Sequence, residues 1–404
     1  MIPGFVPPQT PLLVVRRSAL DHNIATMQGR CNTGGVRLRA HGKTHKCSSL
    51  GRLQVAGGAV GLCAQTVGEA EAFVAGAIRD VLVTAPHAPW AAPRLAALAK
   101  PGARVGAVVD HADQIEGLGA AAREAGVVLD CVIDIDPGTH RAGVHPSRAV
   151  DLARLAAATD GLRYAGLQAY AGHLQHLSDV VARRVADEGV IRLVAGVVEA
   201  LTAAGLAPPV VTGGGTGTHA WDIASGVFSE IQAGSYALMD VEYEACGGPD
   251  GGWPFEQALF VVASVVSANH KSHVTVDAGF KALSVDGPPA RVAHGAAAGS
   301  LWRPMGDEHG MILHPSGVPA LRGGDFIGAV DALDADSAAP WPADAPRGGD
   351  LVWLQPGHCD PTINLYDALH VVGEDGSFER WPVDARRVSR GTRDPAVADR
   401  RRAT

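Results

Sequence analysis

The sequence predicts an α/β protein that combines an N-terminal (β/α)8 barrel of the TIM type with a C-terminal, mainly β domain. Three observations predict this fold: eight short apolar segments that each precede a helical pattern, an alternation of polar and apolar residues inside those segments, and a change to Gly- and Pro-rich turns after about Cys246. Repeated βα units favour a parallel sheet, and eight units favour a closed barrel. We expect the barrel at 1–245, with about the first 20 residues able to pack against the β domain, and the β domain at 246–404.

Eight strand candidates follow one another through the barrel half of the chain. They are "VRLR" from Val36, "AVGLCAQ" from Ala59, "DVLVTA" from Asp80, "RVGAVVD" from Arg104, "VVLDCVIDID" from Val127, "YAGLQAY" from Tyr164, "PPVVTGGG" from Pro208 and "EIQAGSYALMD" from Glu230. Between them lie segments such as "HADQIEGLGAAAREAG", 111–126, and "DVVARRVADEGVIRLVAGVVEALTAAG", 179–205, whose apolar residues recur three and four apart as in helices.

Side-chain parity indicates which face of each strand lies inside the barrel. A strand has a period of two, and its outer face must pack against helices, so apolar residues should face outward. In "VVLDCVIDID" one face is wholly apolar, while the other gathers Asp130, Asp134 and Asp136. In the first and sixth strands this rule sends inward Arg37, Arg39, His41, Lys43 if the extended path continues, Tyr164, Gln168 and Tyr170.

Strand-like pieces separated by turns continue into the C-terminal part of the chain. These are "FVVASVVSA", 260–268, "HVTVDAG", 273–279, "FIGAV", 326–330, and "DLVWLQP", 350–356. The final "RGTRDPAVADRRRAT", from about 390, is polar and charged, so we expect a poorly ordered tail there.

Composition and charge exclude several classes of function. Hydrophobic residues make up 47% and charged residues 19%, which gives enough apolar material for a large core. The net charge of -8, without a basic run, argues against nucleic acid as a partner. The start "MIPGFVPPQTPLLVV" lacks the features of a signal peptide, and no apolar run is long enough for a membrane helix, so we expect no membrane association. The six scattered cysteines form no C-x-x-C pair, which predicts free thiols and a cytoplasmic protein.

Lys43 lies in "RLRAHGKTHKC", 37–47, just after the first predicted strand. A lysine is most often a solvated surface charge, and spacing alone leaves this interpretation open. At the inner C-terminal end of a barrel strand, however, Lys43 lies where such enzymes carry out their chemistry. Positive charge from Arg39 and Lys46 would lower the pKa of Lys43 and make its amine nucleophilic, so the second interpretation is Schiff-base chemistry.

Two glycine-containing turns follow the seventh and eighth strands: "TGGGTGTH", 212–219, and "AGSY", 233–236. Such clusters often form only turns, but backbone amides after these two strands are also the recurrent phosphate site of these barrels. The residues that could cradle a monophosphate are Gly214, Gly215, Thr216, Gly234, Ser235 and Tyr236. A reactive lysine opposite a phosphate cup predicts pyridoxal 5'-phosphate as the cofactor, because its ring spans the distance between the two anchors.

Polar residues also follow the fifth and sixth strands. In "DIDPGTHRAGV", 134–144, Arg141 either holds the loop in an ion pair or donates to an oxygen of the cofactor. "QAYAGHLQH", 168–176, supplies Tyr170, His173 and His176, and a tyrosine with two histidines at the C-terminal end of a strand favours a site. Of Tyr170 and His173, we expect Tyr170 to belong to it.

"QPGHCDPTINLYD", 355–367, contains His358, Cys359 and Asp360. If this segment is extended, residues two apart point to one side, so His358 and Asp360 could bind one metal ion while Cys359 points away. The oxygen donor favours Mn²⁺, with Mg²⁺ and Ca²⁺ as alternatives, over Zn²⁺. The other interpretation is a turn stabilised by Asp360 and Thr362.

Together these motifs resemble the D-threonine aldolase and D-serine dehydratase group within the alanine-racemase-like (fold-type III) enzymes that use pyridoxal phosphate. The resemblance rests on six motifs in the same order: "RAHGKTHK", "GLQAYAGHLQH", "TGGGTG", "DAGFKALS", "GDEHG" and "PGHCDPTINLYD". It implies that Lys43 binds the cofactor covalently, that Arg141 and Tyr170 lie beside it, and that the glycine turns hold its phosphate. It also implies a homodimer in which each active site lies near the β domain of the partner subunit.

Two positions bear on this resemblance. Ala40 stands where the family commonly has proline, which affects only the stiffness of that turn. The dehydratases place a cysteine two residues after the metal-binding histidine, typically for zinc, whereas the aldolases place an aspartate, and this chain has Asp360 there. Cys359 lies between the two positions and is not the dehydratase ligand.

We therefore expect reversible cleavage of D-β-hydroxy-α-amino acids, with D-threonine as the prototype, to glycine and an aldehyde. A metal held by His358 and Asp360 would bind the β-hydroxyl, and His176 would remove its proton, with metal-bound hydroxide as the alternative base. The nearest alternative is a dehydratase of D-serine or D-threo-3-hydroxyaspartate, in which Lys43 takes the α-proton. A racemase would need no metal at the β-carbon, and a non-catalytic pyridoxal phosphate carrier would leave the metal motif without a purpose.

Overall fold

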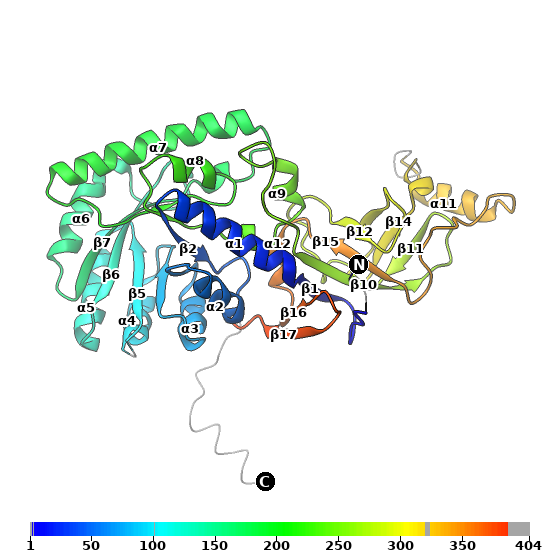
Figure 1. Ribbon diagram of the computed structural model, residues 1–404, viewed down its shortest axis with the longest axis horizontal. Coiled ribbons are helices and arrows are strands. Elements are labelled where there is room, and N and C mark those ends of the chain that lie inside the picture. Colours follow the sequence, from blue (N-terminus) through cyan, green and yellow to red (C-terminus); the bar gives the residue numbers. More distant parts are fainter. Residues whose placement is uncertain (1, 3, 101, 320–323, 387–404) are drawn as a thin grey trace, which may run out of the picture.

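The structure is a computed structural model that describes residues 2, 4–100, 102–319 and 324–386. It contains a closed eight-stranded parallel barrel and a nine-stranded sheet, which lie side by side in Figure 1. The predicted combination of a (β/α)8 barrel and a C-terminal, mainly β region is confirmed. The tail expected from about 390 lies outside the described residues.

Each barrel strand comes from one of the eight segments that the sequence predicts. The strands are β2 (Arg37–His41), β3 (Gly61–Ala64), β4 (Asp80–Val83), β5 (Arg104–Val109), β6 (Leu129–Ile135), β7 (Leu162–Ala169), β8 (Val211–Gly213) and β9 (Glu230–Ile231). The barrel closes where β2 pairs with β9 in parallel. The accompanying helices are α1 (Arg17–Thr33), α2 (Ser48–Ala56), α3 (Val67–Ala75), α4 (Ala92–Ala99), α5 (Ala112–Ala125), α6 (Ala149–Ala158), α7 (Val180–Ala203) and α8 (His219–Ala224).

The second sheet includes a strand that precedes the barrel in the chain. Its strand order is β11-β14-β13-β12-β15-β10-β1-β16-β17. The strands are β1 (Leu12–Arg16), β10 (Leu259–Ser267), β11 (His273–Val276), β12 (Arg291–His294), β13 (Leu301–Pro304), β14 (Gly310–Leu313), β15 (Leu351–Gln355), β16 (Ala368–Val372) and β17 (Phe378–Pro382). β1 is antiparallel to β10 and parallel to β16. Leu13 and Val15 join the main core while Leu12 and Val14 join a smaller cluster, so both faces of β1 are buried.

The predicted parity holds in β6 and fails in part of β7. Asp130 and Asp134 of β6 face the barrel interior, where each contacts polar side chains of other strands. The pairing of β6 with β7 shifts after Cys131, which is a β-bulge, and the parity shifts with it. Ala165 therefore lies in the inner apolar cluster, whereas Tyr164 packs against the outer core, so the prediction that Tyr164 faces inward is wrong.

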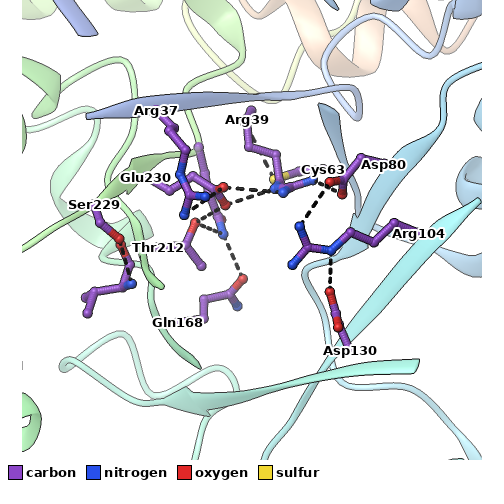
Figure 2. A network of polar contacts seen from close by, with 12 residues as sticks. Arg37, Arg39, Cys63, Asp80, Arg104, Asp130, Gln168, Thr212, Ser229 and Glu230 are labelled. Carbon is purple, nitrogen blue, oxygen red and sulfur yellow. Dashed lines mark hydrogen bonds and ion pairs between the residues drawn. The ribbon is translucent and has the colours of Figure 1, made fainter. Parts of the chain in front are cut away.

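Charged side chains, some of them buried, form a chain of ion pairs across the inside of the barrel (Figure 2). Arg39 donates to Glu230 at 2.8 Å and to Asp80 at 2.6 Å, and Arg104 donates to Asp130 at 2.7 Å. Arg163 also donates to Asp130, at 2.6 Å. Pairing compensates for the cost of taking these charges out of water. This network lies below the mouth of the barrel and includes Arg39 and Asp130, which parity sends inward.

Three short helices complete the description, namely α9 (Val241–Cys246), α11 (Phe326–Ala335) and α12 (Cys359–Ile363). The strand predicted at 326–330 is wrong, because "FIGAV" begins α11. Asp325 caps that helix by accepting from the N–H of Gly328. The six cysteines all lie among the described residues, where they are free and buried. Among the described helices, none is long and apolar enough to cross a membrane.

Candidate active site

Lys43 lies at the C-terminal mouth of the barrel. β2 ends at His41, and the chain turns away through 42–45, so Lys43 follows the strand directly. Its Nζ donates to Oδ2 of Asp360 at 2.5 Å. The Lys43 side chain is 34% exposed and that of Asp360 15% exposed. This contact joins the barrel to α12, which follows β15 of the second sheet, and places the candidate active site between them.

The contact with Asp360 changes the pKa expected for Lys43. Burial lowers the pKa of Lys43, but the charge and hydrogen bond of Asp360, together with Tyr170 and Cys359, outweigh it, so the amine keeps a pKa above its ordinary value. Arg39 is paired with Glu230 and Asp80, and Nζ of Lys46 lies 3.5 Å from Glu69. The prediction that Arg39 and Lys46 lower the pKa of Lys43 is therefore wrong.

His176 reaches the same place from the loop after β7. Its ring centroid lies 6.1 Å from that of His358 and 4.6 Å from the ring of Tyr243, which it meets edge to face. Nδ1 lies 3.5 Å from Oε1 of Glu242, whereas Nε2 is buried and has no hydrogen-bond partner within the described part of the chain. Burial lowers the pKa of His176, which favours the neutral ring. A neutral imidazole with one unpartnered nitrogen can accept a proton.

The segment that carries His358 and Asp360 is not extended as expected. His358 has extended backbone angles, but α12 begins at Cys359 and places Asp360 in its first turn. The strand-alternation argument for pairing His358 with Asp360 is therefore wrong. Thr362 donates to the carbonyl of His358 at 2.8 Å, so a stabilised turn is indeed present. The two side chains still belong to one cluster with Lys43, because each of the three affects the pKa of His176.

Both candidate metal ligands have partners of their own. Nδ1 of His358 lies 2.9 Å from Oδ2 of Asp286, which leaves Nε2 as the nitrogen available to a cation. Although burial raises the pKa of Asp360, the charge and hydrogen bond of Lys43, together with His358 and Cys359, outweigh it and lower the pKa, so this carboxyl is ionised. No group of three or more His, Cys, Asp and Glu gathers as a metal site in the described part of the chain. One imidazole and one carboxylate fit a divalent cation that takes its other ligands from water or substrate.

Arg141 and Tyr170 line a small cavity at the mouth of the barrel. This cavity has a volume of about 30 Å³ and also touches Asp134 and Gln168. The guanidinium carbon of Arg141 lies 5.6 Å from the centroid of the Tyr170 ring. Asp136 accepts from the N–H groups of Gly138 and His140, so the loop is held without the ion pair that the sequence left open for Arg141.

His173, the alternative to Tyr170, points elsewhere. It is exposed, and its Nδ1 lies 3.0 Å from the hydroxyl of Thr139. Tyr170, by contrast, lies close enough to Lys43 to raise its pKa. The structure therefore brings Tyr170 to the Lys43 cluster and leaves His173 outside it.

The glycine turns approach the turn that carries Lys43. A side chain on Gly234 would place its Cβ 2.6 Å from Oγ1 of Thr44, so only glycine allows this approach. That Thr44 oxygen is buried and has no hydrogen-bond partner in the described part of the chain. Gly214 has a φ of 67°, which also favours glycine. An unpartnered buried hydroxyl beside these turns fits a ligand with oxygen acceptors, such as the phosphate of pyridoxal 5'-phosphate.

The predicted phosphate residues do not all face the same way. Thr216 accepts from the N–H of Tyr236 at 3.0 Å, which leaves the Thr216 hydroxyl proton free to donate. The Tyr236 side chain is fully buried in the core, and its hydroxyl accepts from Gln54. Tyr236 thus supports the two turns from behind, whereas Gly214, Gly215, Thr216, Gly234 and Ser235 stay the candidates for the predicted cup.

A larger cleft lies beside this cluster and does not include Lys43. Its volume is about 720 Å³, and it shares Gln65, Ala85 and Pro86 with the small cavity beside Tyr170. Its walls carry none of the clustered titratable groups around Lys43. We therefore place the chemistry at the cluster and not in the cleft.

Three acidic residues of the site escape the motif analysis. Asp240 accepts from the N–H groups of Tyr243 and Cys359, Glu242 faces His176, and Asp286 holds His358. Asp240 is the last residue of "EIQAGSYALMD" and Glu242 follows it by two, so the prediction of a strand there gives neither residue a role in the site. For Asp240 and Glu242, the sequence signal is an acidic residue soon after the eighth barrel strand. For Asp286, it is an acidic residue soon after the motif "DAGFKALS".

Comparisons with known proteins agree with this architecture. The model of the alanine racemase N-terminal domain matches residues 15–241, and that of a putative serine dehydratase domain matches residues 258–372. A 3-hydroxy-D-aspartate aldolase of Paracoccus denitrificans is 38% identical over 94% of this chain and 92% of its own. A D-threonine aldolase of an Arthrobacter species is 35% identical over 94% of this chain and 93% of its own.

A solved structure supports the same assignment. The crystal structure of D-threonine aldolase from Filomicrobium marinum has a TM-score of 0.83 and 35% sequence identity. The match covers 94% of this chain and 96% of that one. With its barrel matched over 15–241 and relatives that align along nearly the whole sequence, the chain belongs to the D-threonine aldolase group of alanine-racemase-like lyases.

Proposed function

We propose that this protein is a pyridoxal 5'-phosphate- and divalent-metal-dependent aldolase that cleaves D-β-hydroxy-α-amino acids reversibly to glycine and an aldehyde. The observation that carries the proposal is the convergence of Lys43, His176, His358 and Asp360 between the barrel mouth and α12. The names of the relatives, D-threonine aldolase and 3-hydroxy-D-aspartate aldolase, support this substrate class.

The cofactor would be held from two sides. Lys43 would bind it covalently, Arg141 and Tyr170 would lie beside its ring, and the turns around Gly214 and Gly234 would take its phosphate together with Thr44. When bound, pyridoxal phosphate supplies a ring that accepts the electrons left on Cα when a bond to that carbon breaks. A lysine committed to the cofactor no longer holds an ammonium ion pair, so the Asp360 carboxylate becomes available to another cation.

His358 and Asp360 would hold that cation, which we propose to be Mn²⁺, with Mg²⁺ or Ca²⁺ as alternatives and Zn²⁺ disfavoured by the carboxylate. A divalent cation at this position would polarise the β-hydroxyl of the substrate. The thiol of Cys359 is buried, and burial raises its pKa well above the ordinary value, so it is not a thiolate ligand.

The chain's own groups account for the proton transfer. The unpartnered Nε2 of His176 would accept the proton of the β-hydroxyl. The electron pair freed on oxygen forms the aldehyde C=O bond as the Cα–Cβ bond breaks, and Cα then takes a proton to give glycine. In the reverse direction His176 would return the proton to the new hydroxyl.

The products formed from D-threonine test the proposal. Purified protein with pyridoxal phosphate and Mn²⁺ should release acetaldehyde and glycine in equal amounts, as measured by aldehyde reduction assay and amino-acid analysis. Asp360→Ala, stripped with chelator and refilled with Mn²⁺, should lose this turnover. Unchanged activity in Asp360→Ala would remove the metal assignment.

A dehydratase is the second candidate, favoured by the match of 258–372 to a putative serine dehydratase domain. In that reaction the Cα–H bond and the Cβ–O bond break, so D-threonine would give 2-oxobutanoate and ammonia. Detection of 2-oxobutanoate in place of acetaldehyde would reject the aldolase in favour of the dehydratase.

We also propose that the protein is a cytoplasmic homodimer. Phe280 and Met305 are 46% and 51% exposed, and they lie on two joined loops, because the N–H of Phe280 donates to the carbonyl of Gly306. Exposed apolar side chains of this size favour contact with a second copy of the chain. Light scattering should give twice the chain mass of 41.6 kDa, whereas the monomer mass would reject the dimer.

A further inference from the structure

Helix α9 connects the two parts of the candidate active site. Asp240 accepts from the N–H groups of Tyr243 and Cys359, both at 2.9 Å. The N–H groups of Val241 and Glu242 donate to the carbonyls of Pro356 and Gly357. The first turn of α9 is therefore fixed to the segment that leads into His358, and the backbone of Glu242 has a defined position.

The loop that carries His176 is fixed to the other end of α9. The Cys246 thiol donates to the carbonyl of His176 at 3.1 Å. Arg183, which is fully buried, donates to the carbonyl of Leu177 at 2.7 Å and to that of Cys246 at 3.2 Å. Tyr243 meets the face of the imidazole at 4.6 Å between ring centroids. These contacts leave the His176 ring little freedom to turn.

The two ring nitrogens of His176 have opposite surroundings. Nδ1 lies 3.5 Å from Oε1 of Glu242, so a small rotation of the Glu242 side chain, with the ring in place, brings the pair within hydrogen-bond distance. Nε2 is buried and unpartnered within the described residues. A neutral imidazole carries its proton on one nitrogen, and a facing carboxylate determines which one. Here the carboxylate favours the proton on Nδ1 and the lone pair on Nε2.

We propose that Glu242 is a positioning residue that keeps a proton on Nδ1 of His176, so that Nε2 accepts the proton of the substrate's β-hydroxyl. The proposal rests on the proposed function for the identity of the proton donor. As the hydroxyl proton moves to Nε2, the ring becomes an imidazolium, whose charge the Glu242 carboxylate stabilises. The proton on Nε2 then passes to water, which restores the neutral ring with Nδ1 still protonated.

Kinetics of Glu242 variants test this role. Glu242→Ala should lower kcat about 10- to 100-fold and change KM less than about threefold, because the partner of a functional histidine orients it without touching substrate. Glu242→Gln keeps a carbonyl acceptor and should have an intermediate kcat. Glu244→Gln is the matched control on the same helix, since Glu244 contacts Arg291 and Gln355, and it should keep kcat within about twofold.

A double-mutant cycle separates action through His176 from an independent effect. If Glu242 acts through this ring, adding Glu242→Ala to His176→Ala should leave the residual kcat unchanged. A further drop equal to that of the single variant would overturn the proposal. Thermal melting of each variant shows whether the fold is kept.

A measurement that needs no turnover distinguishes failure of this proposal from failure of the proposed function. Long-range ¹H–¹⁵N NMR of histidine-labelled protein reports which ring nitrogen is protonated, and the signals lost in His176→Ala identify the ring. Protonation at Nδ1 in the wild type, lost in Glu242→Ala, supports the proposal even if the product from D-threonine is 2-oxobutanoate. Protonation at Nε2 in the wild type rejects the proposal even if the product is acetaldehyde.

Discussion

Lys43 and Asp360 neutralise each other, and that pairing determines what each can do. While the ion pair persists, the lysine is a protonated cation and the aspartate has little affinity for a second cation. If Lys43 binds the proposed cofactor, its ammonium would no longer pair with Asp360, and the carboxylate would be free for another cation. At the scale of residues, cofactor binding and metal binding are therefore expected to favour each other.

The covalent role of Lys43 leads to the first prediction. Lys43→Ala should lose turnover and the long-wavelength absorbance of bound pyridoxal phosphate, because no other amine lies in the cluster. Lys46→Gln, whose lysine faces Glu69 and Asn364, should keep that absorbance. Borohydride reduction followed by mass spectrometry of peptides locates the attachment, and a label on Lys46 would contradict the assignment.

A pH-dependent stability follows from Asp134. Burial raises the pKa of Asp134 to about 7, although Gln168 donates to it and Arg141 partly opposes the shift. A carboxyl with a folded pKa above its unfolded value of about 3.9 binds more protons when folded, so its contribution is present below about pH 4 and is lost as the pH rises to about 7.

Asp134→Asn imitates the protonated form of that carboxyl. It should raise the melting temperature more at pH 8, with an upper bound of about 4 kcal/mol, than at pH 5, where the bound is about 1.5 kcal/mol. Thermal melting at both values of pH measures this difference. Equal shifts at pH 5 and pH 8 would show that the ionisation of Asp134 does not matter.

Among the residues, only those with a chemical signature could be found in the sequence. Lys43, His176, His358 and Asp360 lie in motifs of reactive groups, and the structure gathers them. Glu242 and Asp286 are single acidic residues that become recognisable only when the fold brings them to a histidine. The failed pKa prediction for Lys43 has the same origin, because Asp360 is 317 residues away in the sequence.

At the scale of elements, one carboxylate organises two helices. Asp240 caps α9 and accepts from the first N–H of α12, so Asp240→Ala removes both bonds. Loss of a cap costs about 1 kcal/mol, and a buried unpaired N–H adds about 1–3 kcal/mol. The melting temperature should fall by several degrees, and kcat should fall with it because Asp360 loses its support.

Asp325→Ala provides the matched comparison, since Asp325 caps α11, which lies far from β2, the strand that Lys43 follows, in Figure 1. It should lower the melting temperature by a smaller amount and leave kcat unchanged. Enzyme assays and melting curves of both variants separate loss of a cap from loss of the site. If Asp240→Ala keeps full kcat, α9 does not position Asp360.

The regular periodicity of the barrel segments makes their elements predictable from the sequence. An isolated short segment such as "FIGAV" is not predictable in this way. The longer barrel strands, such as β6, alternate apolar with polar residues, and each of the eight is followed by a turn or helix that marks its end. "FIGAV" is five residues long and suits either a strand or a helix, and the Asp325 cap decided in favour of the helix. The bulge at Cys131 inverted the facing of Tyr164, because one extra residue changes parity without changing composition.

At the scale of the whole molecule, the stability of the barrel depends on the buried ion pair between Arg39 and Glu230. Glu230 is 1% exposed and accepts from Arg39, so Arg39→Ala would remove the main charge partner of a buried carboxylate. Only the Thr212 hydroxyl at 3.1 Å and the more distant Arg37 guanidinium at 3.8 Å would remain beside it. Breaking such a pair costs about 3–5 kcal/mol. The melting temperature should therefore fall markedly. Arg163→Ala should have a small effect, because the Arg163 side chain is 57% exposed and Asp130 keeps Arg104.

A second variant keeps this prediction testable if Arg39→Ala does not fold. Arg39→Met combined with Glu230→Gln leaves no lone charge in the barrel and should recover most of the lost stability. Differential scanning calorimetry of the single and double variants gives the comparison. A double variant as unstable as the single one would mean that packing, rather than charge, sustains this region.

The place of β1 between β10 and β16 has a consequence for how the protein is made. Leu13 pairs with Val261 on one side and with Leu369 on the other, so the ribosome must synthesise most of the chain before β1 has both neighbours. The barrel segments emerge earlier and have all their partners by about residue 231. The leading end of the nascent polypeptide is therefore expected to pair only after the barrel strands have been translated, first with β10 and last with β16.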